Sequence, residues 1–488
     1  MKIKTRARPE GGQGIFLFGF EGQKTLSALG EKVNQLSGGA IKNLFQLGFS
    51  GRLGEAELVL LSKAPWKLAV FIGLGKKEKL DAESLRRAIG AGVRRIKRYS
   101  LKSLEVELFE PGLEVMKRED FARAIAEGFW FSCYQYQEYR EKGDGFPEQI
   151  FLVGETKGLK TVLERSSVLG EEHQYIRELI NRPGADLGPG EFSRLAKESG
   201  KKLGLKVRVY NEAELKKMGY NGILRVGQGS SRPSRLVVME YPGSKKKPIA
   251  LVGKGVTFDS GGISLKRSEK MDRMKYDMAG AGAVLGTVRA CARLGLKENV
   301  IGVIPLVENM PGAGAQRPGD IVRMANGISV EVISTDAEGR MILADALYHS
   351  QKFSPRTIID LATLTGSASI ALGRYAIALL GNNRKLLDAL VSAGEASGER
   401  CWILPLWEEY QELVKSPVAD LRNVGKGREA GTIVGAVFLQ RFIKDNLPWA
   451  HLDIASCAWS DEEHPYLGKG ATGVGLRLLV KYLEEFAC

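Results

Sequence analysis

The 488-residue sequence has little histidine and little cysteine, residues on which most zinc sites and all disulfide frameworks depend. It holds only four histidines and five cysteines, and neither a C-x-x-C pair nor an H-E-x-x-H segment occurs in it. Zinc ribbons and zincin-type proteases are therefore excluded, and a metal ion would have to be held largely by oxygen ligands. The cysteines are odd in number and scattered, as in a cytoplasmic protein with reduced thiols.

Long apolar segments are missing as well. The longest uncharged stretch covers residues 361–373, which is too short to cross a bilayer as a helix. Near the basic N-terminus, the apolar run 14–20 is short and lies between Glu10 and Glu21, a pattern unlike that of a signal peptide. We therefore expect a soluble, cytoplasmic protein that does not bind a membrane.

Positive charge is abundant but unevenly distributed. The 71 lysines and arginines exceed the 57 aspartates and glutamates by 14. Residues 1–100 hold 19 basic against 8 acidic side chains, and residues 201–250 hold 12 against 3, whereas residues 301–350 hold 3 against 6. A basic surface can attract DNA, but no C₂H₂ finger, RNP-like aromatic motif or heptad zipper accompanies it. A solvated surface is the simpler interpretation, and DNA binding stays the alternative function.

Short apolar runs alternate with helical patterns along the chain, as in α/β folds. In the first part the patterns predict strands at residues 58–61, 68–72, 104–109 and 149–153, and helices at 82–98 and 121–139. In the second part they predict strands at 207–210, 235–241, 249–252, 299–306, 357–361 and 451–454, and helices at 171–180, 271–294 and 341–353.

This alternation predicts two α/β domains. We expect the boundary between residues 155 and 170, before the turn-rich segment 181–189 that opens the second domain. Residues 1–165 are expected to form a smaller, macro-like N-terminal α/β domain, whose lack of catalytic motifs indicates a role in assembly or regulation. Residues 166–488 are expected to form the larger catalytic domain, an α/β/α sandwich with a central mixed sheet.

Charged side chains follow apolar strands of the second domain, at the sheet edge where open α/β folds bind ligands. Lys254 and Asp259 come after the strand 249–252. Lys266 follows on the same loop, and Asp277 precedes a run of small residues that favours close helix packing. The residues alone leave two interpretations open: Asp259 is a turn residue or a ligand, and Asp277 is an ion-pair partner or a ligand.

The segment 330–340 begins as a predicted strand rich in β-branched residues. Two carboxylates, Asp336 and Glu338, follow this strand, and Arg340 comes after them. Both carboxylates can face the same side of an extended turn, where like charges disfavour joint ionisation unless cations compensate. With the two other aspartates they offer oxygen-rich ligands that suit Mg²⁺, Mn²⁺ or Zn²⁺. Two such ions about 3.5–4 Å apart could activate water for hydrolysis, so the spacing by itself indicates a two-metal hydrolase and leaves its substrate open, a phosphoester being one candidate.

Two longer motifs indicate a relationship. G-K-G-V-T-F-D-S-G-G-I-S-L-K (residues 253–266) and S-T-D-A-E-G-R (residues 334–340) closely resemble the signature motifs of the leucyl (cytosol) aminopeptidase family of metallopeptidases. The resemblance continues through the second domain in residues 308–311, 317–320, 360–366 and 448–455. The first domain resembles the family only in its α/β character and its position.

The resemblance implies a role for each matching residue. Lys266 would polarise the scissile carbonyl and stabilise the oxyanion, and Arg340 would hold a bicarbonate that acts as general base. Asp259 and Glu338 would touch both of two metal ions. Lys254 is unusual as a ligand, because it must be deprotonated to offer a lone pair. The implied metal ligands are Lys254, Asp259, Asp277, Asp336 and Glu338, and the implied lining of the first substrate pocket is Met274, Thr363, Gly366 and Ala455.

The implied activity is removal of the N-terminal residue from peptides, with leucine and other apolar residues preferred. The free α-amino group of the substrate would bind one metal ion, and a metal-bridging water would attack the carbonyl. The implied cofactors are two divalent ions per subunit, Mn²⁺ or Zn²⁺ with Mg²⁺ or Co²⁺ as alternatives, together with bicarbonate. The family typically assembles as a homohexamer, which the sequence by itself does not indicate.

The sequence departs from the family's usual wording at three places. Ser334 stands where asparagine is common, Ala185 replaces another asparagine, and the loop 310–316 differs. None of these positions has an implied catalytic or metal-binding role, although Ser334 precedes the implied ligands closely enough to alter a supporting hydrogen bond. For His451 and His464 we expect structural roles.

Overall fold

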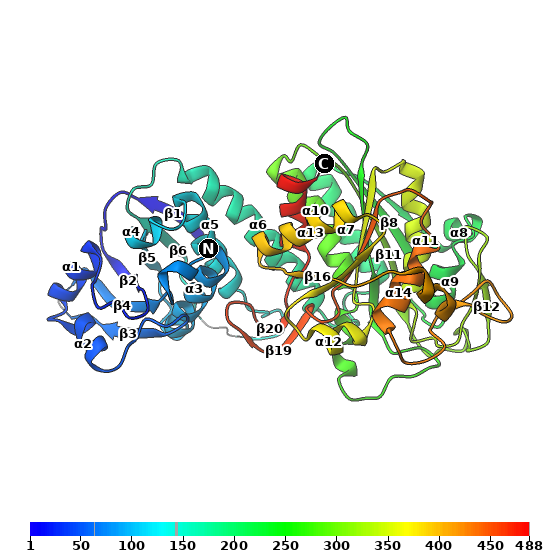
Figure 1. Ribbon diagram of the computed structural model, residues 1–488, viewed down its shortest axis with the longest axis horizontal. Coiled ribbons are helices and arrows are strands. Elements are labelled where there is room, and N and C mark those ends of the chain that lie inside the picture. Colours follow the sequence, from blue (N-terminus) through cyan, green and yellow to red (C-terminus); the bar gives the residue numbers. More distant parts are fainter. Residues whose placement is uncertain (63, 142–144, 488) are drawn as a thin grey trace. The chain divides into compact units, whose positions relative to one another are not determined.

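The computed structural model describes residues 1–62, 64–141 and 145–487. The chain folds into two compact units, the first made of Met1–Gln174 with Ser460–Lys469 and the second of Tyr175–Trp459 with the residues from Gly470 onward. Each unit is a layered α/β structure, as expected (Figure 1). The predicted boundary after residue 165 falls within helix α6 (Leu159–Asn181), and the division into residues 1–165 and 166–488 stays a prediction.

The first unit is built on a six-stranded sheet in the order β1-β6-β5-β2-β4-β3. Strand β3 runs antiparallel to β4, and the other paired strands run parallel. Alternate residues of β2 pack against helices on opposite faces: Phe16 and Phe18 against α3 and α5, Ile15 and Leu17 against α1 and α2. A strand covered on both faces is apolar throughout, which explains its continuous apolar run. The strands are β1 (Lys2–Arg6), β2 (Gly12–Gly19), β3 (Ala56–Leu60), β4 (Trp66–Gly73), β5 (Ser103–Glu107) and β6 (Gln149–Val153), and the helices are α1 (Ala28–Leu36), α2 (Ala40–Gln46), α3 (Ala82–Ile96), α4 (Glu110–Leu113) and α5 (Arg118–Ser132).

The second unit is built on a nine-stranded mixed sheet in the order β16-β15-β18-β14-β9-β11-β8-β7, with β10 paired to β11. The central strands β18, β14, β9 and β11 run parallel, and β15 and β8 run antiparallel to this group. The strands are β7 (Lys206–Tyr210), β8 (Arg235–Pro242), β9 (Ile249–Gly253), β10 (Gly255–Asp259), β11 (Asn299–Asn309), β14 (Thr357–Ala362), β15 (Ile377–Gly381), β16 (Cys401–Ile403) and β18 (Trp449–Asp453). A separate small sheet joins β12 (Ile321–Arg323), β13 (Ser329–Glu331) and β17 (Leu421–Arg422).

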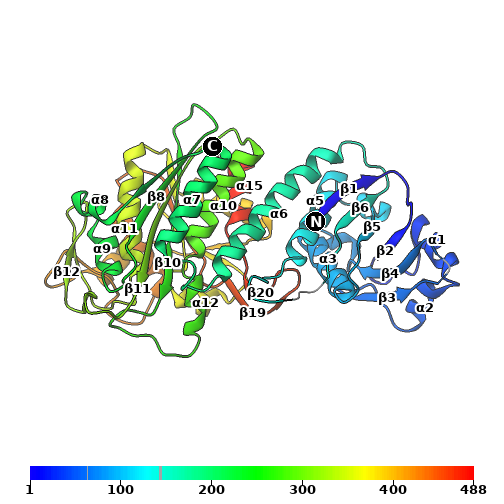
Figure 2. The ribbon, with the colours of Figure 1, turned by 180° about the vertical axis from the view of Figure 1, so that it is seen from behind.

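Helices cover both faces of the large sheet, which makes it the predicted α/β/α sandwich. Ile249 and Leu251 of β9 pack with α7, α10, α13 and α15, whereas Ala250 and Val252 pack with α9, α11 and α14. Figures 1 and 2 show α7 and α10 on one side of the sheet and α9 and α11 on the other. The helices are α7 (Pro189–Leu203), α8 (Glu212–Lys217), α9 (Asn221–Gly227), α10 (Ala279–Leu294), α11 (Gly339–Ser350), α12 (Gly366–Leu372), α13 (Arg384–Ser397), α14 (Gly431–Gln440) and α15 (Leu476–Lys481).

The helix predicted at residues 271–294 is in fact two elements, the 3₁₀ segment η2 (Met271–Tyr276) and α10. Asp277 lies between them, where side-chain bonds to the ends of two strands hold it outside a continuous helix. The first turn of α10 is packed directly against the sheet, because a Cβ on Gly280 would lie 2.2 Å from the carbonyl oxygen of Leu361. The small residues of this turn therefore bring α10 close to the ends of β9 and β14.

The helix predicted at residues 121–139 is also shorter than expected, because α5 ends at Ser132 and turns follow. Tyrosines alternate with glutamine and glutamate after Cys133, so this segment lacks the apolar stripe that a packed helix needs. Among the described residues, no helix combines the length and the apolar character that a membrane span requires.

Candidate metal centre

The carboxyl ends of the parallel strands β9, β14 and β18 meet at one edge of the large sheet, where open α/β folds bind ligands. Lys254 directly follows β9, Thr363 directly follows β14, and Ala455 lies just beyond β18. Asp259 ends the neighbouring strand β10. The N–H of Ala281 in α10 donates to the carbonyl oxygen of Lys254 at 2.8 Å, so the first turn of α10 borders the same edge.

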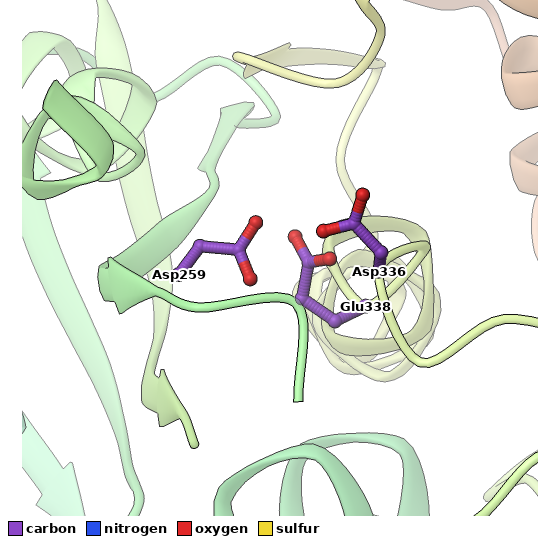
Figure 3. A group of neighbouring side chains, drawn as sticks. All are labelled: Asp259, Asp336 and Glu338. Carbon is purple, nitrogen blue, oxygen red and sulfur yellow. The ribbon is translucent and has the colours of Figure 1, made fainter. Parts of the chain in front are cut away.

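Three carboxylates lie together at this edge. Asp259, Asp336 and Glu338 each offer one oxygen, and these oxygens lie within 4.8 Å of one another. Figure 3 shows Asp259 at the end of its strand, facing Glu338 and Asp336 at the start of a helix, which is α11. Asp259 and Glu338 are buried, whereas the side chain of Asp336 keeps 37% of its accessible surface. The cluster is therefore open to solvent at Asp336.

The buried ammonium of Lys254 lies between two carboxylates. Its Nζ is 2.8 Å from Oδ1 and 2.7 Å from Oδ2 of Asp277, and 2.9 Å from Oε1 of Glu338. It also donates to the carbonyl oxygen of Thr363 at 2.9 Å, and the Thr363 hydroxyl donates to Oδ1 of Asp277 at 2.7 Å. Burial would lower the pKa of Lys254, but the carboxylates outweigh burial and raise it. Asp277 thus joins the site through Lys254 and Thr363.

Lys266 joins the cluster from the more exposed side. Its Nζ lies 2.8 Å from Oδ2 of Asp259 and 2.5 Å from Oδ1 of Asp336. Burial would lower the pKa of Lys266, but the carboxylates around it raise the pKa above its ordinary value. The Lys266 side chain is 23% exposed, against 3% for Lys254. Of these two ammonium groups, Lys266 is the one that a molecule in solvent can reach.

The carboxylates of this site outnumber its ammonium groups. Burial raises the pKa of Asp259 to about 6, and repulsion from Glu338 acts in the same direction. Burial would also raise the pKa of Glu338, but Lys254 and Lys266 outweigh it and lower that pKa. Oε2 of Glu338 is buried and has no hydrogen-bond partner in residues 1–62, 64–141 and 145–487. An unpartnered carboxylate oxygen beside other carboxylates is the donor chemistry that a hard divalent cation takes, so these residues fit a metal ion.

Arg340, in the first turn of α11, is a buried cation with an unsatisfied donor. Burial lowers the pKa of Arg340 to about 10, while Glu338 and Asp453 oppose that shift. Its Nε has no hydrogen-bond partner among the residues that the structure describes. A buried guanidinium with an unsatisfied N–H fits a small planar anion such as bicarbonate.

Two buried residues to which the sequence assigned no role connect the loops that carry the carboxylates. Nδ2 of Asn309 donates to Oδ1 of Asp259 at 2.8 Å and to the carbonyl oxygen of Thr335 at 3.1 Å. Oγ1 of Thr335 donates to the carbonyl oxygen of Gly261 at 2.6 Å and accepts from the N–H of Ser264 at 2.8 Å. Asn309 lies in the segment 308–311 and Thr335 in the motif 334–340, both of which resemble the family, and this resemblance is the only feature of the sequence that could have identified them.

The four residues predicted to line the substrate pocket lie on four different segments of the second unit. Met274 lies on η2 and Gly366 begins α12. Thr363 and Ala455 follow β14 and β18. Thr363 contacts Asp277 through its hydroxyl, and the pocket that all four would form together stays a prediction.

The two histidines of unassigned role lie outside the carboxylate cluster. His451 is buried in β18, where its Nδ1 lies 2.6 Å from Oδ1 of Asp360. The other oxygen of Asp360 accepts from Nε1 of Trp449 at 2.7 Å. Burial would lower the pKa of His451, but Asp360 outweighs burial and raises it. His464 lies on β19 (Trp459–His464), in the part of the chain that folds with the first unit.

Gly339 leaves the space that Lys254 occupies. A Cβ at Gly339 would lie 2.3 Å from Cε and 2.7 Å from Nζ of Lys254. Because Lys254 is enclosed, Gly339→Ala should displace its ammonium from Asp277 and Glu338, at a cost of about 1–3 kcal/mol in unfolding free energy. If Lys254 serves the site, kcat/KM should fall by at least about 10-fold, the usual effect of disturbing a residue that supports a metal centre. Steady-state kinetics and thermal melting measure both effects.

Gly190→Ala in α7 is the matched control for this substitution. A Cβ at Gly190 meets nothing within 4 Å, so that variant should keep wild-type kinetics and melting temperature. Full activity in Gly339→Ala would mean that the observed position of Lys254 is irrelevant to the reaction.

Comparison with known proteins decides the family. The sequence model of the cytosol aminopeptidase family, catalytic domain, matches residues 174–480, and the model of its N-terminal domain matches residues 15–143. The chain belongs to the cytosol aminopeptidase family. As a member it is a metal-dependent aminopeptidase, a hydrolase that acts on peptides. The relationship expected from the two motifs is confirmed.

Individual relatives of this cytosol aminopeptidase match it over nearly its whole length. A probable cytosol aminopeptidase of Geobacter sp. (strain M21) is 42% identical over 465 residues, which are 93% of this chain and 94% of the relative. One from Geobacter sulfurreducens is 44% identical over 464 residues, 93% of this chain and 92% of the relative. A solved structure titled bottromycin maturation enzyme BotP in complex with Mn is 33% identical, with a TM-score of 0.86 and coverage of 97% of this chain and 99% of that one. The likeness covers both units, so the two-domain fold predicted from the sequence is confirmed.

Proposed function

We propose that this cytosol aminopeptidase removes leucine and other apolar residues from the N-termini of peptides at a centre of two divalent metal ions. The observation that carries the proposal is the group of three carboxylates with two lysines paired to it. The ions are Mn²⁺ or Zn²⁺, with Mg²⁺ or Co²⁺ as alternatives, since oxygen ligands accept all four. The residues that would hold the ions are Lys254, Asp259, Asp277, Asp336 and Glu338, with Asp259 and Glu338 proposed as ligands shared between them.

Lys266 and Lys254 have different roles in the proposed reaction. When bound, the ions supply the positive charge that acidifies a water molecule and polarises a carbonyl group. Lys266, whose ammonium is partly exposed, donates to the oxygen of the scissile carbonyl as negative charge develops on it. Lys254 has to lose a proton to serve as a ligand, because an ammonium has no lone pair. Its contacts with Asp277 and Thr363 hold Nζ beside the carboxylate cluster.

The remaining site residues hold the general base and the substrate. Arg340 binds bicarbonate through its buried guanidinium, whose Nε has no partner among the described residues. This keeps a general base beside the carboxylate cluster. Met274, Thr363, Gly366 and Ala455 line the pocket for the first side chain of the substrate, and their mixture of small and apolar groups favours leucine.

Assembly and location follow the family resemblance. We expect a cytoplasmic homohexamer in which the N-terminal domain serves assembly or regulation. Nothing in the family match or in the names of the relatives points to DNA, so we interpret the basic excess as a solvated surface.

Removal of the metal should abolish activity reversibly. Full-length protein treated with a chelator should lose hydrolysis of leucine p-nitroanilide to background and regain it with Mn²⁺ or Zn²⁺, because the proposed chemistry needs the charge of the ions. An N-acetylated leucine peptide should not be cleaved, and an aryl phosphate should not be hydrolysed. Unchanged anilide hydrolysis after chelation, or phosphate hydrolysis in its place, would contradict the proposal.

A further inference from the structure

Asp336 and Glu338 lie on a turn, residues 334–338, whose own hydrogen bonds are weak. Within it, the N–H of Ala337 donates to the carbonyl oxygen of Ser334 at 3.3 Å, and the N–H of Asp336 donates to Oγ of Ser334 at 3.3 Å. Both distances exceed the usual range for such bonds. The turn therefore needs contacts from elsewhere if its two carboxylates are to keep a fixed position.

Asn309, Gly261 and Ser264 contact the turn at Thr335. A fully buried side chain from a distant part of the chain contacts the residues on either side of Thr335. Oδ1 of Asn423 accepts from the N–H of Ile333 at 2.8 Å and from the N–H of Ser334 at 3.3 Å. Its Nδ2 donates to the carbonyl oxygen of Ser334 at 2.6 Å and to that of Ala337 at 3.5 Å. One amide thus binds the beginning of the turn through two short hydrogen bonds, of 2.8 Å to Ile333 and 2.6 Å to Ser334, and makes one long contact with Ala337 at 3.5 Å.

The small sheet brings Asn423 to the turn. Strand β17 runs parallel to β13, with Arg422 opposite Glu331, and the N–H of Asn423 donates to the carbonyl oxygen of Glu331 at 3.0 Å. At the other end of this pairing, the carboxylate of Asp420 accepts from the N–H and the hydroxyl of Ser329 at 2.7 and 2.6 Å. Asn423 is the residue after β17, so its position relative to the turn is set by the register of the two strands.

We propose that Asn423 is a positioning residue of the metal centre, whose amide fixes the turn 334–338 so that Asp336 and Glu338 face Asp259. The inference rests on the proposed function, because Asn423 acts only through two carboxylates proposed as ligands. An amide suits the position because it accepts from N–H groups at one end and donates to carbonyl oxygens at the other. Residues that orient metal ligands contribute about 10–100-fold to metal affinity.

The experiment measures Mn²⁺ binding by calorimetry on chelator-treated, full-length protein, with the melting temperature of the same metal-free sample. Asn423→Ala should bind Mn²⁺ about 10–100-fold more weakly than wild type. Asn423→Asp keeps the acceptor but turns a carboxylate oxygen toward the carbonyl oxygen of Ser334. Its added negative charge would by itself favour a cation, so weaker Mn²⁺ binding by this variant identifies positioning and not charge.

Gln351→Ala is the matched control. Gln351 is also a buried amide that holds a distant turn, since its Nε2 donates to the carbonyl oxygen of Phe442 at 2.8 Å and its Oε1 accepts from the N–H of Lys444 at 2.9 Å. That turn carries no proposed ligand. Gln351→Ala should therefore lower the melting temperature and leave Mn²⁺ affinity unchanged.

The outcomes separate this inference from the proposed function. Mn²⁺ affinity of Asn423→Ala within twofold of wild type, with a melting temperature lowered as in Gln351→Ala, would overturn the positioning role alone. Failure of wild type to bind Mn²⁺, or binding by Asp336→Ala as tight as by wild type, would overturn both. If Asn423→Ala does not fold, Asn423→Asp decides: tighter or equal Mn²⁺ binding overturns the role, and weaker binding supports it.

Discussion

Replacement of Glu338 by glutamine should reduce kcat/KM for a leucine peptide by about 10³-fold or more. Glu338 is buried, belongs to the carboxylate cluster and pairs with Lys254 through Oε1, while its Oε2 has no hydrogen-bond partner among the described residues. Glutamine has nearly the same volume and keeps an oxygen, but it lacks the negative charge that holds a cation. A loss of several kcal/mol in the stabilisation of charge at the transition state corresponds to a factor of this size.

The measurement combines initial rates with the metal content of the same sample, which should fall below that of wild type. Glu298→Gln is the control, because Glu298 is also a buried carboxylate, paired with Lys246 and Arg356 at 2.9 Å each, but lies outside the cluster. It should keep wild-type rates. Equal losses in the two variants would show that any buried carboxylate matters for folding, and the assignment of Glu338 as a ligand would then fail.

Replacement of Lys266 by methionine should lower kcat by about 10²–10³-fold, the usual effect of removing one donor to a developing oxyanion. Methionine keeps the length of the side chain but has neither charge nor N–H groups. The ammonium of Lys266 competes with cations for Asp259 and Asp336, so its removal should leave Mn²⁺ affinity unchanged or increase it. Kinetics and calorimetry on the same preparation measure the two effects.

This pattern is the opposite of the one expected for Glu338→Gln, in which activity and metal binding fall together. Lys206→Met, which removes an exposed lysine paired with Glu240 at 2.8 Å, is the neutral control. If Lys266→Met loses metal binding and activity together, Lys266 is needed to form the metal site, and the oxyanion role would be wrong.

Strands were easier to predict than helices in this protein. The apolar run 149–153 is β6 to the residue, and the run 357–361 lies within β14, because parallel strands covered on both faces are continuously apolar. Helical periodicity was misleading where one polar residue has a stronger partner elsewhere. Asp277 accepts hydrogen bonds from Lys254 and Thr363 at the strand ends. These bonds interrupt the predicted helix 271–294, which is divided into η2 and α10.

The candidate site divides in the same physical way. The carboxylates and lysines stand in contiguous motifs, since each loop at the sheet edge is one short piece of sequence. Asn423 could not be identified from a contiguous motif, because it lies 86 residues from Ala337 along the chain. Only the pairing of β17 with β13 brings the two residues together. Nor does sequence separation reveal that Lys266 lies between Asp259 and Asp336, whereas Asp277 pairs with Lys254.

The short segment Ser460–Lys469 has a consequence for dissecting this protein. It folds with the first unit, where Tyr466 and Leu467 pack with Trp130 and Phe131, and a Cβ on Gly90 would lie 2.2 Å from the carbonyl oxygen of Pro465. The first unit is therefore discontinuous in sequence, and the chain passes between the units three times. A fragment that ends at residue 174 would uncover the apolar surface of Trp130 and Phe131, so a soluble N-terminal fragment needs this late segment added back through a linker or a circular permutation.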